Sequence, residues 1–387
     1  MTKLVSKWNY PTTVRFGAGR ISELAEAVGA LGIKRPLFVT DPGLAKLPVV
    51  AKALKVLDDA KAPYGVFSDV KPNPVESNLT AGIHAFRKGA HDGVIAFGGG
   101  SALDLGKLIA FQAGQTRPVW DFEDIGDWWT RANAARIAPI VAVPTTAGTG
   151  SEVGRAAVLT HEASHTKKVI FHPKMLPGIV IADPELTVGM PPFITAGTGM
   201  DAFAHCLEAY CAPGYHPMAD GIALEGMRLV LENLPTAYAN GKDLTARAHM
   251  MSAAAMGATA FQKGLGAIHS LSHPIGALYD THHGMTNAVF MPYVLAFNAH
   301  AINEKLAALA RYLDLPGQNA ASVTDWVLRL REELGIPHTL KEIGVDEDVV
   351  PEAARMAELD PSTGGNPVAV VAKDYEVLFR KAIRGEL

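Results

Sequence analysis

The chain has 387 residues, of which 48% are hydrophobic and 19% are charged, so it can bury a large core and is not expected to be disordered. Its 35 basic and 39 acidic residues are mixed along the sequence and contain no basic block, which argues against nucleic-acid binding. The N-terminus lacks the apolar region of a secretory signal, and no apolar run reaches the roughly 18 residues of a membrane span. The two cysteines, Cys206 and Cys211, are expected to be reduced thiols of a cytoplasmic protein.

In the first half of the chain, short β-rich runs alternate with stretches of helical character. The expected elements, in chain order, are strands at 35–41, 64–70, 92–100, 136–146 and 178–184, with helices at 44–60, 75–90 and 101–113 between them. This alternation predicts a parallel sheet with helices on its faces, and such sheets bind ligands beyond the carboxyl ends of their strands. Residues 1–190 are therefore expected to form an α/β dinucleotide-binding domain.

Beyond Asp183 the strand-like runs almost disappear. Helical stretches rich in Ala, Leu and Met follow one another to the C-terminus, for example at 219–240 and 243–262. The Met-Pro-Pro segment at 190–192 is a natural hinge. Residues 191–387 are therefore expected to form a separate, all-helical domain.

The strand at 92–100 runs directly into three glycines, Gly98, Gly99 and Gly100. Glycine lets the backbone approach a ligand closely, and Ser101 is placed to cap a helix whose free N–H groups would face an anion. This pattern is typical of a pyrophosphate-binding turn. It matches neither GxGxxG nor a P-loop, however, so a plain turn is the alternative.

A second turn follows the next strand, at 144–152, and offers the hydroxyl groups of Thr145, Thr146, Thr149 and Ser151. By itself it could be a threonine-rich helix cap. Two such turns at successive strand ends favour a ligand shared between them.

Asp41 ends the first strand, where a carboxylate can accept hydrogen bonds from the ribose hydroxyls of an adenosine. The same carboxylate would repel a 2′-phosphate, so Asp41 predicts a preference for NAD over NADP. Because Pro42 follows, Asp41 could instead be a helix N-cap with proline at the first helical position.

Histidines are concentrated in the second half of the chain. Asp201 and His205 lie four residues apart in a helical stretch, which places them on one helix face. A second segment contains His269, His273 and the adjacent pair at 282–283. A single histidine is more often an ordinary polar residue than a ligand. One carboxylate combined with several imidazoles on helices nevertheless favours a divalent transition metal.

At these residues the sequence resembles the iron-containing alcohol dehydrogenase family. The resemblance covers almost the whole chain, through the segments GGGSALD, PTTAGTGSE, IADPEL, MDAFAHCLEAY and HSLSHPIGALYDTHHGMTNA in the family's order. It implies an α/β dinucleotide-binding domain followed by an all-α metal-binding domain, an architecture that dehydroquinate synthase shares. It also implies a homo-oligomer, with a dimer favoured.

The resemblance places the family's metal ligands on Asp201, His205, His269 and His283. The metal is expected to be Fe(II), although zinc or another divalent ion could occupy such a site because zinc binds these donors more tightly. A histidine at position 205 favours the iron branch over the zinc-dependent glycerol dehydrogenase branch. His273 corresponds to a family histidine that lies near the nicotinamide and is a candidate proton relay, whereas His282 matches no ligand.

The family's cofactor segments also map onto this chain. The pyrophosphate region corresponds to Gly98 through Ser101 and to Asp104, and the second turn to Thr145, Thr146 and Thr149. Lys167 matches a cofactor-contacting lysine, with Lys168 as the alternative.

The implied reaction is the reversible, NAD-linked and metal-dependent oxidation of a primary or secondary alcohol to its aldehyde or ketone. The competing hypotheses are a zinc-type polyol dehydrogenase, a metal-dependent lyase or hydrolase on the same scaffold, and a nucleotide-binding protein without activity. Which alcohol is the physiological substrate cannot be predicted from these residues.

Overall fold

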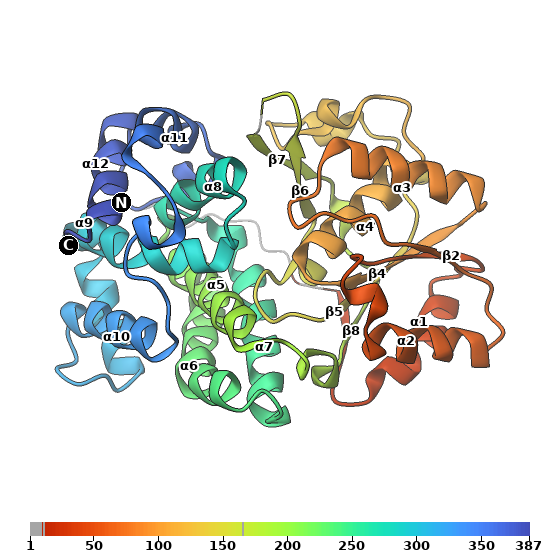
Figure 1. Cartoon of the computed structure of the whole chain (residues 1–387), viewed down its shortest axis with the longest axis horizontal. Helices are drawn as coiled ribbons and strands as arrows, with labels where there is room; N and C mark the ends of the chain where they lie inside the picture. Colours follow the sequence, from red (N-terminus) through yellow and green to blue (C-terminus); the bar gives the residue numbers. More distant parts are fainter. Residues whose placement is uncertain (1–9, 11, 165) are drawn as a thin grey trace. The chain divides into compact units, whose positions relative to one another are not determined.

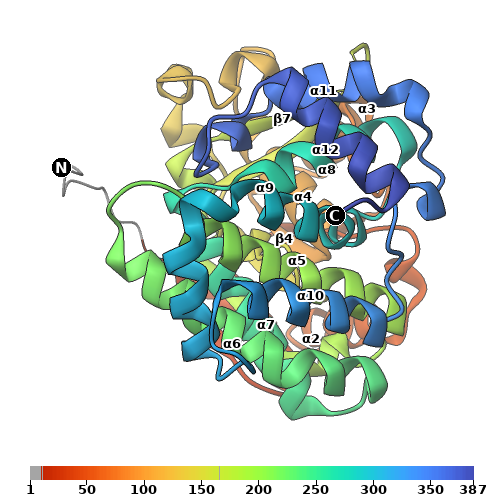
Figure 2. The same ribbon diagram turned by 90° about the vertical axis from the view of Figure 1, so that its left-hand side faces the viewer.

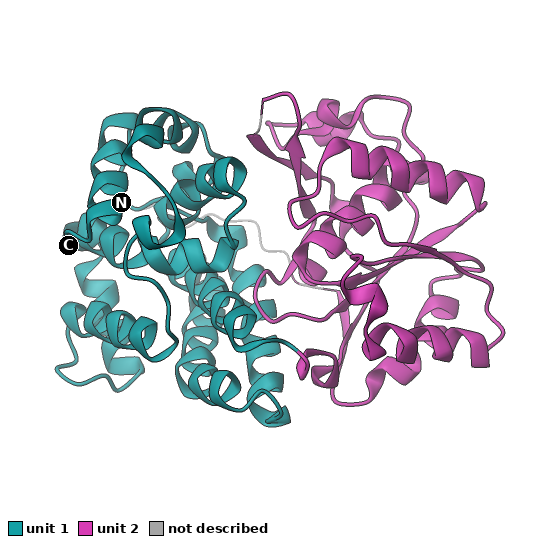
Figure 3. Ribbon diagram, viewed as in Figure 1, with its two compact units in different colours: residues 1–9, 190–387 teal, residues 10–189 magenta. Residues whose placement is uncertain are grey.

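The computed structural model describes residue 10, residues 12–164 and residues 166–387. The described residues form two compact units, one made of residues 10–189 and the other of residues 190–387 (Figure 3). The first unit is α/β and the second is helical, as the alternating and purely helical patterns predict.

The α/β unit is built around a six-stranded parallel sheet with the strand order β1-β8-β5-β4-β2-β3 (Figure 1). Its strands are β1 (Thr13–Phe16), β2 (Pro36–Val39), β3 (Gly65–Phe67), β4 (Gly93–Gly98), β5 (Ile140–Pro144) and β8 (Ile179–Ala182). Helices α1 (Leu24–Ala30) and α2 (Pro48–Asp59) cover one face, and α3 (Glu76–Lys88) and α4 (Gly100–Gln112) cover the other (Figure 1). The predicted parallel α/β architecture is confirmed.

Alternate side chains of the central strands point to opposite faces of the sheet, as strand geometry requires. Phe38, Ile95 and Phe97 are buried in the core that the sheet forms with α1 and α2. On the other face, a Cβ atom added to Gly106 of α4 would lie 2.6 Å from Cβ of Ala96. This glycine therefore lets α4 lie close against β4, which fixes the start of α4 beside the end of that strand.

Two parts of the α/β unit were not expected from the sequence. The edge strand β1 has only four residues, none of them fully buried, so it lacks a continuous apolar run. The antiparallel pair β6 (Ala156–His161) and β7 (Thr166–Phe171) forms a second small sheet.

The single helix expected at 44–60 is wrong, because the structure divides it into a 3-10 turn at Leu44–Lys46 and helix α2. Leu47 between them has an extended backbone, with φ −91° and ψ 153°. The cause is Pro48, because a residue that precedes proline is disfavoured in the helical region and proline suits the first helical position.

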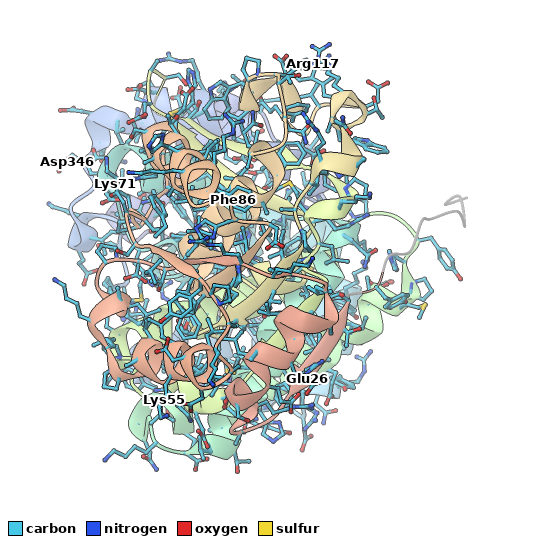
Figure 4. The ribbon with its side chains drawn as sticks, turned by 90° about the vertical axis from the view of Figure 1, so that its right-hand side faces the viewer. Glu26, Lys55, Lys71, Phe86, Arg117 and Asp346 are labelled. Atoms are coloured by element: carbon cyan, nitrogen blue, oxygen red, sulfur yellow. The ribbon has the colours of Figure 1, made fainter. Side chains whose placement is uncertain are left out.

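Charged side chains cover the outside of the α/β unit. Lys55 and Arg117 project from its surface (Figure 4), and each forms an ion pair with an aspartate four residues further on, at 2.7 Å to Asp59 and 3.2 Å to Asp121. Exposed pairs of this kind contribute roughly 0–1 kcal/mol each. The stability of this unit therefore rests mainly on its buried apolar side chains.

Every strand in the described part of the chain lies before residue 183, and the second unit is helical. Its helices are α5 (Pro192–Cys211), α6 (Pro217–Ala239), α7 (Leu244–Ala260), α8 (Ala267–Tyr279), α9 (His283–Tyr312), α10 (Ala320–Glu333), α11 (Val350–Glu358) and α12 (Ala372–Arg384) (Figure 2). None of the described helices combines the length and the apolar character needed to cross a membrane.

Helix α5 is the core of the helical unit, because it packs against α6, α7 and α9. Every residue from Thr195 to Cys211 is buried, including two carboxylates and one histidine. Burying charged groups away from water is unfavourable unless they have polar or metal partners. The polar side chains of α5 therefore mark the part of this unit where a functional site is expected.

Candidate metal centre and nucleotide-binding turns

The two glycine- and threonine-rich turns lie side by side in the α/β unit, because β4 and β5 are neighbouring parallel strands. Gly98 pairs with Pro144, and the backbone N–H of Thr145 donates to the carbonyl of Gly98 at 3.0 Å. Cβ atoms added to the next two glycines of the first turn would lie 3.2 Å and 2.6 Å from the Cγ2 atoms of Thr146 and Thr149, respectively. The glycines thus leave room for the threonines of the second turn.

The first turn ends at the start of α4. Gly98 has φ 147°, a backbone conformation that favours glycine, and Gly99 is the N-cap of the helix. The expectation that Ser101 caps the helix is wrong, because Ser101 lies inside the first turn of α4 and its hydroxyl donates to the carbonyl of Pro72. The first N–H groups of α4 have no side-chain cap, and such a helix start suits an anionic ligand.

Asp41 lies just after the end of β2, next to the first glycine-rich turn. Its Oδ1 accepts hydrogen bonds from the N–H groups of Gly43 and Leu44, at 3.0 and 2.8 Å, which is the capping alternative. Its Oδ2 lies on the side of Gly98, 3.8 Å from where a Cβ of that residue would stand. One carboxylate oxygen thus stabilises the turn after β2 while the other faces the first glycine-rich turn.

Asp104 is engaged within the protein. Its Oδ1 accepts from the hydroxyl of Ser151 at 2.5 Å and lies 3.1 Å from Nζ of Lys107, while its Oδ2 accepts from the N–H of Val158 at 2.9 Å. These bonds tie α4 to the second turn and to β6. The observed role of Asp104 is therefore to hold the two turns together.

Lys167 and Lys168 are consecutive residues of β7 and point to opposite faces of the β6–β7 pair. Nζ of Lys168 forms an ion pair with Glu123 at 2.7 Å. Lys167, paired in register with Thr160, lies on the other face. The cofactor contact expected of Lys167, with Lys168 as the alternative, stays a prediction.

In the helical unit, the structure brings together the side chains of Asp201 and His205 from α5, His269 from α8 and His283 from α9. Oδ1 of Asp201 lies 3.8 Å from Nε2 of His205, 3.8 Å from Nε2 of His269 and 3.6 Å from Nε2 of His283. The first three residues are buried and have ligand atoms within 4.8 Å of one another. The His283 side chain is 26% exposed and forms the accessible side of the cluster.

Close packing of α5 and α9 makes this cluster possible. A Cβ atom added to Gly284 would lie 2.0 Å from the carbonyl oxygen of Gly197, so only glycine fits there. His282, which directly precedes α9, accepts a hydrogen bond from the N–H of Met285 at 3.4 Å and serves as the N-cap of that helix. The short side chain of Asp201 can therefore reach the start of α9, where His283 lies.

Glu208 orients His269. Oε2 of Glu208 lies 2.5 Å from Nδ1 of His269, and its Oε1 accepts from the N–H of Ile268 at 2.7 Å. Burial lowers the pKa of His269, but the carboxylates of Glu208, Asp201 and Asp360 outweigh burial and raise that pKa overall. With Nδ1 facing Glu208, Nε2 faces Asp201, which is the usual arrangement of a metal-binding histidine and its supporting carboxylate.

Sequence reasoning missed Glu208 although a signal was present. It lies seven residues after Asp201 and three after His205, so all three share one face of α5. A third acidic or imidazole group on the face of a buried helix could have been recognised as part of the site.

His273 lies beside the cluster. Its ring stacks on that of His283 with the centroids 5.3 Å apart, and its Nδ1 lies 2.7 Å from Oδ2 of Asp360. Oδ1 of Asp360 accepts from the N–H of Ser362 at 2.8 Å. Burial raises the pKa of Asp360, but His273 and Ser362 outweigh this effect, so the pKa lies below its usual value. Asp360 was not predicted, because no sequence spacing links it to His273.

The donor set of the cluster fits a divalent transition metal. Three imidazole nitrogens surround one carboxylate oxygen, and neutral imidazole with carboxylate is a donor combination that Fe(II), Zn(II) and related ions accept. The orientation of His269 by Glu208 is a further feature of such sites.

Comparisons with known proteins show the family to which the chain belongs. A sequence model of iron-containing alcohol dehydrogenases matches residues 11–184, and a model of the C-terminal domain of the same family matches residues 195–383. The 4-hydroxybutyrate dehydrogenase of Cupriavidus necator is 38% identical over 97% of this chain and 99% of its own length. The NAD-dependent methanol dehydrogenase of Bacillus methanolicus is 33% identical over 96% of this chain and 98% of its own length. The crystal structure of a 1,3-propanediol oxidoreductase has a TM-score of 0.92 and 36% identity, covering 98% of this chain and 100% of that one.

The chain therefore belongs to the iron-containing alcohol dehydrogenase family. It is an oxidoreductase that interconverts an alcohol and its carbonyl compound. The matching models are those of iron-containing alcohol dehydrogenases, and the relatives named above are all dehydrogenases or oxidoreductases. The comparisons therefore give no support to the zinc-type polyol dehydrogenase, lyase, hydrolase or non-catalytic alternatives.

Proposed function

We propose that the chain catalyses the NAD-linked, reversible oxidation of a primary alcohol at a divalent metal held by Asp201, His205, His269 and His283. The observation that carries the proposal is the convergence of three imidazole Nε2 atoms on Oδ1 of Asp201, at 3.6 to 3.8 Å. A metal bound there supplies Lewis-acid polarisation of the substrate oxygen. The protein holds the donor atoms in place, and it excludes water because three of the four ligands are buried.

His273 is the proposed proton relay. It lies next to His283, at the accessible side of the cluster, and Asp360 fixes the orientation of its ring. An imidazole with one nitrogen held by a carboxylate presents the other nitrogen for proton transfer from the alcohol.

The proposed cofactor is NAD, which carries the hydride. Gly98, Gly99, Gly100 and Ser101 would surround its pyrophosphate at the start of α4, with the threonines at 145, 146 and 149 and Lys167 beside them. The NAD-dependence of the methanol dehydrogenase from B. methanolicus supports this choice. Asp104 takes part by holding the turns together, since both of its oxygens bond to protein groups.

We infer that the substrate is a short primary alcohol, or its aldehyde, with a second polar group at its far end. This inference rests on the relatives at 38% and 36% identity, which are named for 4-hydroxybutyrate and 1,3-propanediol. Both compounds are primary alcohols of three or four carbons with a terminal polar group.

The proposal includes a cytoplasmic enzyme that forms a homodimer. Cys206 and Cys211 are both free and buried, which suits a reducing compartment. Val14 and Phe16 of the edge strand β1 are 37% and 41% exposed, and an edge strand can pair with a second copy of the same strand. The size of the particle in solution tests this part.

Two measurements test the proposed function. After anaerobic loading with Fe(II), the enzyme should form NADH from short diols and hydroxy acids. The wild type should also hold close to one equivalent of metal, whereas His283→Ala should hold much less. No NADH with any alcohol would refute the reaction, and equal metal content in both proteins would remove His283 from the ligands. Zinc in a preparation without iron loading agrees with the proposal, because these donors bind zinc more tightly.

A further inference from the structure

Asn287 of α9 lies inside the ligand cluster, four residues after His283. It is fully buried, and its side-chain nitrogen Nδ2 donates to Oδ1 of Asp201 at 2.8 Å. The same nitrogen lies 3.3 Å from Nε2 of His269 and 3.2 Å from Nε2 of His283. One amide nitrogen therefore touches the donor atoms of three of the four proposed ligands.

The contact with Asp201 fixes the orientation of this amide. An ionised carboxylate only accepts hydrogen bonds, so the amide oxygen in place of Nδ2 would set two oxygens against each other at 2.8 Å. Asn287 Oδ1, in turn, has no hydrogen-bond partner among the described residues. Leaving a buried carbonyl unpaired is unfavourable. The hydrogen bond from Nδ2 to Asp201 therefore sets the orientation of the amide, and its oxygen is left without a partner among the described residues.

The donor atoms of Asp201, His269 and His283 are stabilised by a hydrogen-bond donor placed among them. A carboxylate oxygen and two imidazole lone pairs lie within a few ångströms of one another, so they repel when no cation stands between them. The two N–H groups of Asn287 place partial positive charge against all three atoms. These N–H groups reduce the repulsion between the donor atoms, as a metal ion would, but with partial charges only.

We propose that Asn287 is a positioning residue that keeps the metal ligands gathered in the metal-free enzyme. Binding of the metal takes the imidazole lone pairs, so the contacts of Asn287 with His269 and His283 are given up while its bond to Asp201 remains. This inference rests on the metal site of the proposed function. It follows that Asn287 stabilises the metal-free form more than the metal-loaded form, and therefore weakens metal binding.

The test compares Asn287→Leu with a matched control, Asn298→Leu. Asn298 lies on the same helix and is also buried, but its side-chain nitrogen donates to Oδ1 of Asn366 at 2.9 Å and not to one of the four proposed ligands. For each protein, Zn(II) affinity is measured by competition with a chelating indicator near pH 8. The unfolding temperature is measured with chelator and with Zn(II). If Asn287→Leu does not fold, Asn287→Ala replaces it in the same measurements.

We expect Asn287→Leu to tighten Zn(II) binding by roughly 5- to 10-fold, the equivalent of about one net hydrogen bond. Its unfolding temperature should fall more without metal than with Zn(II). Asn298→Leu should lower both temperatures alike and leave the affinity unchanged.

Two results would overturn the role of Asn287 and leave the proposed function standing. Weaker Zn(II) binding in Asn287→Leu would mean that the amide supports the metal-loaded form. Equal losses of stability with unchanged affinity would mean that Asn287 only packs. A wild type that binds no Zn(II) would instead refute the proposed metal site and, with it, this inference.

Discussion

His273 and Asp360 form a partly buried hydrogen bond between side chains that are 87 residues apart in the sequence, with Nδ1 of the histidine 2.7 Å from Oδ2 of the aspartate. Because His273 and Ser362 hold the pKa of Asp360 below its usual value against the effect of burial, the aspartate stays ionised at ordinary assay pH. A charged carboxylate therefore orients the imidazole that is proposed to relay the proton.

His273→Ala should keep its metal and lose turnover. General acid–base catalysis contributes about 100-fold or more to a rate, so kcat should fall by at least that factor. The measurements are metal content and kcat across the pH range. Wild-type activity at every pH would mean that His273 only packs against His283.

Asp360→Asn should leave the metal content unchanged, lower kcat roughly tenfold and alter the shape of its pH dependence, because an amide orients the imidazole less strongly than a carboxylate. The KM for NAD should change little. A lower unfolding temperature with wild-type kcat and an unchanged pH profile would show that the bond is purely structural.

Glu208→Gln should weaken metal binding. Loss of a carboxylate that supports a histidine ligand reduces metal affinity about 10- to 100-fold, and the 2.5 Å contact makes Glu208 such a partner of His269. Zn(II) competition measures the effect. Glu225→Gln is the control, since Glu225 pairs with Arg228 on the partly exposed surface of α6. Equal affinities in the two variants would contradict the supporting role.

The wild type should prefer NAD over NADP because of Asp41, and Asp41→Asn should reduce that preference about tenfold or more, equivalent to about 1.4 kcal/mol. Asparagine keeps an oxygen for the N–H groups of Gly43 and Leu44 but removes the charge that repels a 2′-phosphate. The measurement is kcat/KM for both cofactors, with Asp41→Gly beside it. A wild type that prefers NADP, or an unchanged ratio in both variants, would reduce Asp41 to its capping role.

Glu152 should make stability depend on pH. Burial raises its pKa from the ordinary value of 4.5 to about 7, so the folded protein binds this proton more tightly than the unfolded chain does. The destabilisation is therefore absent below about pH 4.5 and complete above about pH 7, where it reaches about 3 kcal/mol. Glu152→Gln should gain in unfolding temperature over the wild type at pH 8 and gain little at pH 5. A gain that is the same at both pH values would show that Glu152 does not titrate in this range.

Local patterns in the sequence were sufficient for the architecture. Buried strands and amphipathic helices leave periodic signals, so the alternation up to Ala182 and the helical series after it could be predicted. The pairing of Asp201 with His205 follows from helical spacing in the same way. The short edge strand β1 and the β6–β7 pair gave weaker signals, because β1 is mostly exposed, most of β7 is only partly buried, and neither offers a continuous apolar run.

The sequence by itself thus determined the α/β and helical architecture, the family, and the residue types that make up the two sites. The tertiary structure decided which side chains meet: Asp360 with His273, Asn287 with three of the proposed ligands, and Asp41 with the turn at Gly98. The physical reason is that contacts between distant segments depend on how closely helices and strands pack. In this chain that distance is set by glycines such as Gly284, where no side chain fits between α5 and α9.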